Sequence, residues 1–113
     1  MNKTRASRYT YVPIISFEKA QGSYFIFDGH VHSVAHCSSE VFKQAVRDVR
    51  YKRFDNPATE NLVNREETDL VIRWFILNEL CRLNSSIKLY PSEARATSAL
   101  KRLSTPEASQ SHD

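Results

Sequence analysis

Glycine is scarce in this chain, with only 2 among 113 residues, and proline is limited to 4. A phosphate cradle of the P-loop or dinucleotide-binding kind needs several glycines close together, so such a site is excluded. Cysteine is limited to Cys37 and Cys81. Two thiols in a chain of this length indicate reduced, partly buried residues rather than a disulfide framework.

Long apolar runs are lacking too. No stretch of 18 apolar residues occurs, and residues 1–8 are polar and basic. The sequence therefore predicts neither a membrane span nor a secretory signal, and we expect a cytoplasmic protein. The composition, 41% hydrophobic and 26% charged, is that of an ordinary globular domain.

What is present begins with a β-hairpin. Asp28 and Gly29 separate two short runs, 23–27 and 30–35, and this dipeptide suits a two-residue type I′ turn. The predicted register pairs Phe27 with His30, Ile26 with Val31, and Phe25 with His32. A further strand is expected over residues 9–17, which are rich in aromatic and β-branched residues. Its Pro13 places it at an edge or in a bulge.

Two main helices are expected after the hairpin. The first begins at a Ser38 or Ser39 cap and ends near Phe54; its apolar stripe consists of Val41, Phe42, Ala45, Val46 and Val49. Residues 55–63 are expected to be a connector. Asn64, with Glu67 three positions on, resembles a capping box, and predicts a buried central helix that runs past Trp74 to Leu83.

The remaining elements complete the predicted organisation. A short strand is expected at residues 87–90, and a short helix, capped by Ser92, is expected to end at Leu103. Residues 1–8 are predicted to be a flexible basic arm, 9–103 a single domain, and 104–113 a disordered tail. The predicted fold class is α+β, with a three-stranded antiparallel meander packed on the two main helices and the short C-terminal helix.

A basic stripe is the pattern that bears most on function. Lys43, Arg47 and Arg50 follow one another at helical spacing, opposite the apolar stripe of the first helix. The predicted partner-binding residues are Lys43, Arg47, Arg50, Lys52 and Arg53, helped by Lys3, Arg5 and Arg8 of the arm. Lysine and arginine neutralise phosphates, so the expected function is non-enzymatic binding of an anionic partner, a nucleic acid or a nucleoprotein.

Aromatic side chains could add base stacking to this interface. The residues considered for it are Phe25, Phe27 and Tyr51. Phe25 and Phe27 share one hairpin face with His30 and His32. The sequence does not decide whether that face is buried; the other face is apolar enough to form the core, so partial exposure is expected.

Two alternative functions stay open. The first is a small inhibitor or adaptor, such as a phage or plasmid counter-defence or immunity protein, that binds an acidic or other protein. The second is metal binding by His30, His32, His36 and Cys37, where the two strand histidines at i and i+2 project from one face.

Catalysis has weaker support. His36 and Cys37 are adjacent, so on a strand their side chains would point to opposite faces and could not share a proton. Acidic residues near the start of the second helix are explained by its dipole. We expect no enzymatic activity and no cofactor. Neither the identity of the partner nor the oligomeric state follows from the sequence.

Overall fold

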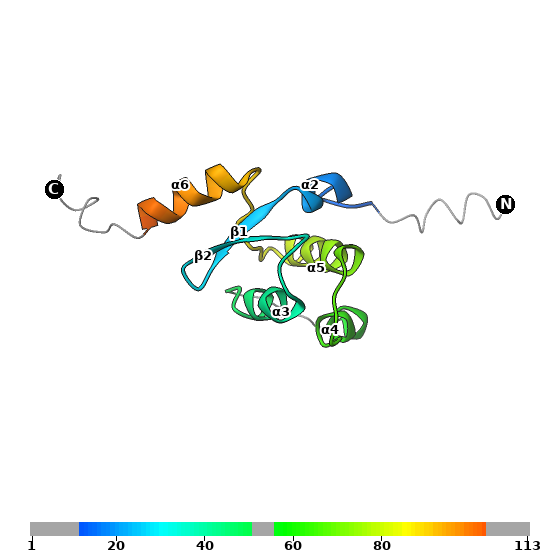
Figure 1. The fold of residues 1–113 in the computed structure, drawn as a ribbon. Helices are drawn as coiled ribbons and strands as arrows, with labels where there is room; N and C mark the ends of the chain where they lie inside the picture. Colours follow the sequence, from blue (N-terminus) through cyan, green and yellow to red (C-terminus); the bar gives the residue numbers. More distant parts are fainter. Residues whose placement is uncertain (1–11, 51–55, 104–113) are drawn as a thin grey trace.

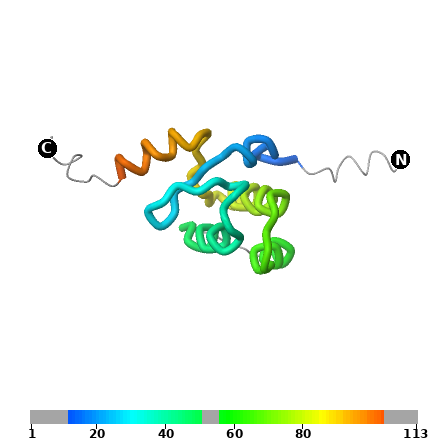
Figure 2. Tube along the Cα trace, viewed as in Figure 1, coloured from blue at the N-terminus to red at the C-terminus, as the bar shows by residue number. Residues whose placement is uncertain are grey.

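The computed structural model describes residues 12–50 and 56–103. The elements in chain order are α2 (Phe17–Gln21), β1 (Tyr24–Phe27), β2 (His30–Ser33), α3 (Ser39–Arg47), α4 (Pro57–Val63), α5 (Leu70–Arg82) and α6 (Glu93–Leu103). In Figure 1, α2 and α6 lie on one side of the hairpin, while α3 and α4 lie on the other. The chain trace in Figure 2 shows the same arrangement. The predicted α+β class is confirmed.

The hairpin has the predicted turn and register. Asp28 and Gly29 both have positive φ angles, 55° and 76°. Two successive left-handed residues are what a type I′ turn requires, and its twist matches that of the strands. β1 and β2 pair antiparallel, with Phe27 opposite His30 and Phe25 opposite His32.

The third strand of the predicted meander is not seen in the described chain. Residues 12–16 form no strand, and Phe17 already begins α2. Ser16 caps that helix, since its hydroxyl accepts a hydrogen bond from the Lys19 N–H at 3.0 Å. The local cap thus overrides the β propensity of the preceding residues; residues 9–11 lie outside the described chain.

A single bridge extends the sheet beyond β1. Tyr24 N donates to Tyr90 O at 2.9 Å, and Tyr90 N donates to Tyr24 O at 2.8 Å. The short strand expected at residues 87–90 is therefore reduced to one bridged residue. This bridge holds the 88–91 segment beside β1.

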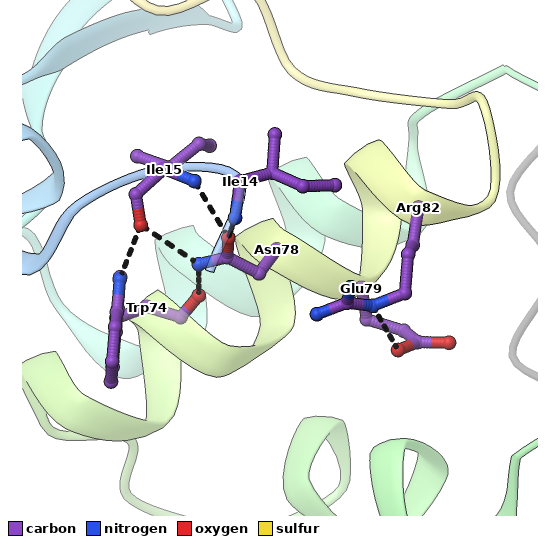
Figure 3. A network of polar contacts seen from close by, with 6 residues as sticks. All are labelled: Ile14, Ile15, Trp74, Asn78, Glu79 and Arg82. Carbon is purple, nitrogen blue, oxygen red and sulfur yellow. Dashed lines mark hydrogen bonds and ion pairs between the residues drawn. The ribbon is translucent and has the colours of Figure 1, made fainter. Parts of the chain in front are cut away.

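The segment before α2 is held by the side chain of Asn78 on α5 (Figure 3). Asn78 Oδ1 accepts hydrogen bonds from the backbone N–H groups of Ile14 at 2.6 Å and Ile15 at 2.7 Å. Trp74 Nε1 donates to Ile15 O at 2.6 Å. The backbone groups that a third strand would have paired in the sheet are thus bonded to side chains of α5.

The predicted helix bounds need correction at three places. α3 is capped by Ser38, as expected, but it ends at Arg47 with Asp48 as C-cap, well short of Phe54. Residues 57–63, expected to be a connector, form α4, because Asn56 caps it and Pro57 occupies its first turn.

Asn64 is the C-cap of α4 and not the N-cap of the next helix. The central helix α5 begins later, after Asp69, whose carboxylate accepts from Ile72 N at 3.0 Å. It ends as expected near Asn84, which has a φ of 63°. Ser85 N then donates to Leu80 O and Asn84 N to Cys81 O, which closes a Schellman motif.

The core lies between the hairpin, α3 and α5. Its largest fully buried side chains include Phe25 of β1, Phe42 of α3, and Ile76, Leu77 and Leu80 of α5. The Phe25 and Phe42 rings meet edge to face, with centroids 6.5 Å apart. The Phe25 face of the hairpin is therefore the core face, opposite to the expectation of partial exposure.

The other face of the hairpin is covered by α6. Tyr24, Ile26 and Val31 on this face are half-buried, and α6 packs against both strands. The buried residues of α6 are Ala96 and Ala99, whose small side chains allow a close approach. Ser92 caps this helix as predicted, since its hydroxyl accepts from Arg95 N at 3.2 Å.

None of the helices in the described ranges combines the length and the apolar character needed to cross a bilayer.

Candidate functional site

The cations of α3 are engaged with the connector between α4 and α5. Lys43 Nζ donates to Arg65 O at 2.9 Å, and Arg47 Nη2 donates to Asn64 Oδ1 at 2.7 Å. Arg50 is exposed but lies beyond the end of α3. The side chains of Lys43 and Arg47 thus fix α3 against the 64–65 segment.

The surroundings of this predicted stripe are of mixed charge. Residues 39–69 contain six basic and seven acidic side chains, so the region as a whole is not basic. The remaining predicted partner-binding residues, Lys3, Arg5, Arg8, Lys52 and Arg53, lie outside the described residues. That these side chains bind a partner stays a prediction.

The predicted stacking residues are placed as follows. Phe25 is fully buried and cannot stack on a base; this corrects the prediction. Phe27 is half-buried, and its carbonyl oxygen lies 3.2 Å from His32 Nε2. Tyr51 lies outside the described residues.

The histidines and Cys37 do not come together as a metal site. Within residues 12–50 and 56–103, no three or more His, Cys, Asp or Glu side chains are grouped to hold an ion. The rings of His30 and His32 have centroids 6.3 Å apart, and His36 is exposed.

Cys37 instead contacts the buried guanidinium of Arg73. Arg73 Nη1 donates to Val34 O at 2.7 Å and lies 3.5 Å from Cys37 Sγ. Burial raises the pKa of the Cys37 thiol, and the charge of Arg73 offsets only part of that rise. A protonated thiol is a poor nucleophile, so this geometry gives no support to thiol catalysis.

A cluster of cations that the sequence analysis missed lies beside α6. Lys88, Arg95 and Arg102 line one surface hollow of about 370 Å³. Its other lining residues are Leu89, Tyr90, Pro91 and Ser98. Among the residues that the structure describes, no carboxylate belongs to this lining. We call this feature the basic hollow.

The fold assembles the basic hollow from two segments. Arg95, Ser98 and Arg102 stand at i, i+3 and i+7 on α6 and therefore share one helix face. The Tyr24–Tyr90 bridge fixes the neighbouring strand segment, which places Lys88 across from them. Lys88 Nζ lies 5.8 Å from the centroid of the Tyr90 ring, a cation–π distance.

The charge of this region is strongly one-sided. Residues 87–103 contain four basic side chains and one acidic side chain. Lys88, Arg95 and Arg102 are exposed, and none of them forms an ion pair with a carboxylate in the described part of the chain. Three cations on one concave surface are available to an anion from solution.

The basic face of α6 could have been found in the sequence from the helical spacing of Arg95, Ser98 and Arg102. The contribution of Lys88 could not be found in this way, because it depends on a bridge between residues 66 positions apart in the chain. A comparison of net charge by segment would have favoured residues 87–103 over residues 39–69 as the basic surface.

A second hollow, of about 350 Å³, adjoins the first and shares Leu89, Tyr90 and Pro91 with it. Its other lining residues are Glu18, Lys19, Gly22 and Ser23, from α2 and the turn that follows. We call this the adjoining hollow.

Comparisons with family models, with curated proteins and with solved structures find no match for this chain.

Proposed function

We propose that this protein binds nucleic acid without catalysing a reaction, and that the phosphate backbone lies in the basic hollow. The observation that carries the proposal is the convergence of Lys88, Arg95 and Arg102 on one hollow, to which residues 12–50 and 56–103 contribute no carboxylate. Arginine suits this role because its planar guanidinium donates two parallel hydrogen bonds to a phosphate.

Ser98 and the cation pattern add to this support. A serine hydroxyl can donate to a phosphate oxygen, and Ser98 lies between the two arginines on the same helix face. The hollow is open to a chain of phosphates, since its three cations are exposed. The α3 cations Lys43 and Arg47 are assigned a smaller role because they bond to the 64–65 segment.

A matched pair of variants tests the proposal. Arg102→Gln and Lys101→Gln remove the same charge from adjacent positions of α6, but only Arg102 lines the basic hollow. Binding to fluorescent DNA and RNA oligomers is measured by anisotropy at low and at moderate salt. We expect Arg102→Gln to weaken binding about tenfold, as for a hydrogen bond to a charged group. Lys101→Gln should change it much less.

The variants Lys43→Gln and Arg47→Gln test whether the α3 cations contribute to binding as much as the basic hollow does. We expect them to weaken binding less than Arg102→Gln and to lower stability, since each loses a bond to the α4–α5 connector. No binding of any oligomer at low salt would overturn the proposal. Equal losses for Arg102→Gln and Lys101→Gln would overturn the assignment to the basic hollow.

A protein partner is the second candidate, and exposed apolar side chains of α5 favour it. Val71 and Phe75 are 46% and 37% exposed. Large exposed apolar groups on one helix are typical of protein interfaces. A defined complex from cell extract that survives nuclease and tolerates Arg95→Gln and Arg102→Gln, but not Val71→Ser, would support this candidate over the first.

A further inference from the structure

Two hollows of similar size lie next to each other and differ in charge. Counted over the described residues, the basic hollow carries three cations, whereas the adjoining hollow carries one acidic residue, Glu18, and one basic residue, Lys19. Leu89, Tyr90 and Pro91 line both and so form their common wall. One side of this wall suits an anion, and the other side does not.

The adjoining hollow has the character of a site for a neutral, flat, partly apolar group. Leu89 and Pro91 supply apolar surface, and Gly22 contributes no side chain. Glu18 repels a phosphate, but its carboxylate can accept hydrogen bonds from an amino group. Its volume of about 350 Å³ falls within the range of small-molecule sites, roughly 300 to 1,000 Å³.

We infer that the nucleic acid is single-stranded, with phosphates in the basic hollow and one unpaired base in the adjoining hollow. This inference rests on the proposed function. A base that enters a hollow must expose its hydrogen-bonding edge, so it cannot be paired in a duplex at the same time. The hollows share a wall, as the base and phosphate of one strand require.

The position of the adjoining hollow is fixed by long-range contacts. α2, which supplies Glu18 and Lys19, follows the segment that Asn78 holds on α5 (Figure 3). Ser23 is buried, and its hydroxyl donates to Lys19 O at 2.5 Å. The opposite wall is held by the Tyr24–Tyr90 bridge. Both walls are thus fixed before a ligand binds.

The first experiment compares a single strand with the duplex of the same sequence. A duplex has the higher charge density, so simple attraction to phosphates favours it. The inference predicts the opposite order, with the single strand bound about tenfold more tightly at the same salt concentration, as stacking and hydrogen bonding of one base allow.

The second experiment uses Glu18→Gln, with Glu93→Gln as the matched control. Both remove one negative charge, but Glu93 lines neither hollow. General electrostatics predicts that both variants bind every oligomer more tightly. A carboxylate bonded to a base amino group predicts that Glu18→Gln binds an oligocytidylate about fivefold more weakly, because the amide oxygen that remains accepts from cytosine N4 without the negative charge that strengthens the bond. Oligothymidylate has no exocyclic amino group and should follow the control.

The outcomes distinguish a failure of the single-strand inference from a failure of the proposed nucleic-acid binding. A preference for the single strand with a cytosine-specific loss in Glu18→Gln supports the inference. Equal or tighter binding of the duplex, or a Glu18→Gln variant that behaves like Glu93→Gln on every oligomer, overturns it but leaves the proposed function standing. Absence of all nucleic-acid binding overturns the proposed function and this inference together.

Discussion

Asn78 makes four hydrogen bonds from a fully buried position on α5. Its oxygen accepts from two consecutive backbone N–H groups, those of Ile14 and Ile15, and its nitrogen donates to the carbonyl groups of Ile15 and Trp74. One side chain thus satisfies main-chain groups of two segments, which makes it the main polar contact between α5 and the chain before α2.

Asn78→Ala should lower the free energy of unfolding by about 2 to 3 kcal/mol, because part-buried and buried N–H groups lose their acceptor. Urea denaturation measures the change. Glu79→Ala is the control one position away: its contact with Arg82, at 3.9 Å, is partly exposed, so a change below about 1 kcal/mol is expected. Similar losses in both variants would contradict the role given to Asn78.

Arg73 is a second residue whose burial is unusual. It is 4% exposed, and no carboxylate within the described ranges pairs with it. Its guanidinium instead donates to the carbonyl groups of Thr68 and Val34 and lies 5.3 Å from the Phe42 ring centroid. The charge is held by neutral acceptors and a ring, and it influences the thiol beside it.

Cys37 gives a prediction for alkaline pH. Burial raises the pKa of its thiol in the folded protein above the ordinary value of 9.0. The folded state therefore keeps its proton at pH values where the unfolded state has lost it, so this contribution to stability is complete below about pH 9 and is lost as pH rises through the folded pKa. Denaturation at successive pH values should show stability falling above pH 9.

The control for this prediction is Cys37→Ala. We expect it to cost about 1 kcal/mol at neutral pH and to have a shallower alkaline decline than the wild type. Cys81 remains in the variant, and burial raises the pKa of that thiol as well, so the decline should be reduced but not abolished. An unchanged alkaline slope would contradict the assignment to Cys37.

At the scale of elements, α6 depends on two alanines for its place on the hairpin. Ala96 is fully buried and Ala99 nearly so, whereas Leu103 at the end of the helix is 68% exposed. Small side chains bring the helix backbone close to the strands, and this closeness sets the distance between Arg95 or Arg102 on α6 and Lys88 opposite.

Ala96→Leu should destabilise the protein by about 1 to 3 kcal/mol through overpacking and weaken nucleic-acid binding, although no charge changes. Urea denaturation and anisotropy measure the two effects. Ala94→Leu, at an exposed position of the same helix, should alter neither. Full binding by a folded but destabilised Ala96→Leu variant would show that the spacing of the cations does not matter.

The difference between predicted and observed elements has local causes. The hairpin followed from Asp28-Gly29 because a two-residue turn with positive φ angles fixes its own register. The prediction of a third strand was wrong because the backbone groups of Ile14 and Ile15 bond to Asn78 and Trp74, far along the chain. Asn64 was assigned to the wrong helix end, since Asn56 with Pro57 and, later, Asp69 provide the real starts.

For the whole molecule, the salt dependence of binding reports how many cations contact phosphates. Three contacts to a single strand predict a log–log slope of about −2 for affinity against salt. The double variant Arg95→Gln/Arg102→Gln should reduce the slope to about −0.7. A slope near −4 in the wild type would indicate that the α3 cations also contact the strand, as the sequence alone predicted.

The site was harder to predict than the fold, for a reason that concerns the whole molecule. Basic residues are spread along the sequence, and a helical stripe such as Lys43 and Arg47 is visible from spacing alone. Whether the cations of such a stripe form hydrogen bonds within the protein depends on acceptors such as Asn64 Oδ1 and Arg65 O, which come from another segment. The Lys88 side of the basic hollow likewise requires the tertiary bridge.

The contact between Ile14 and Asn78 has a consequence for biosynthesis, because the partners are 64 positions apart. At about 5 to 20 residues per second, a ribosome needs roughly 3 to 13 s to add the residues between them. During that interval the nascent Ile14–Ile15 segment has no Asn78 to bind. The Tyr24–Tyr90 bridge forms later, because Tyr90 is synthesised after Asn78. The adjoining hollow is therefore assembled only after translation has passed residue 90.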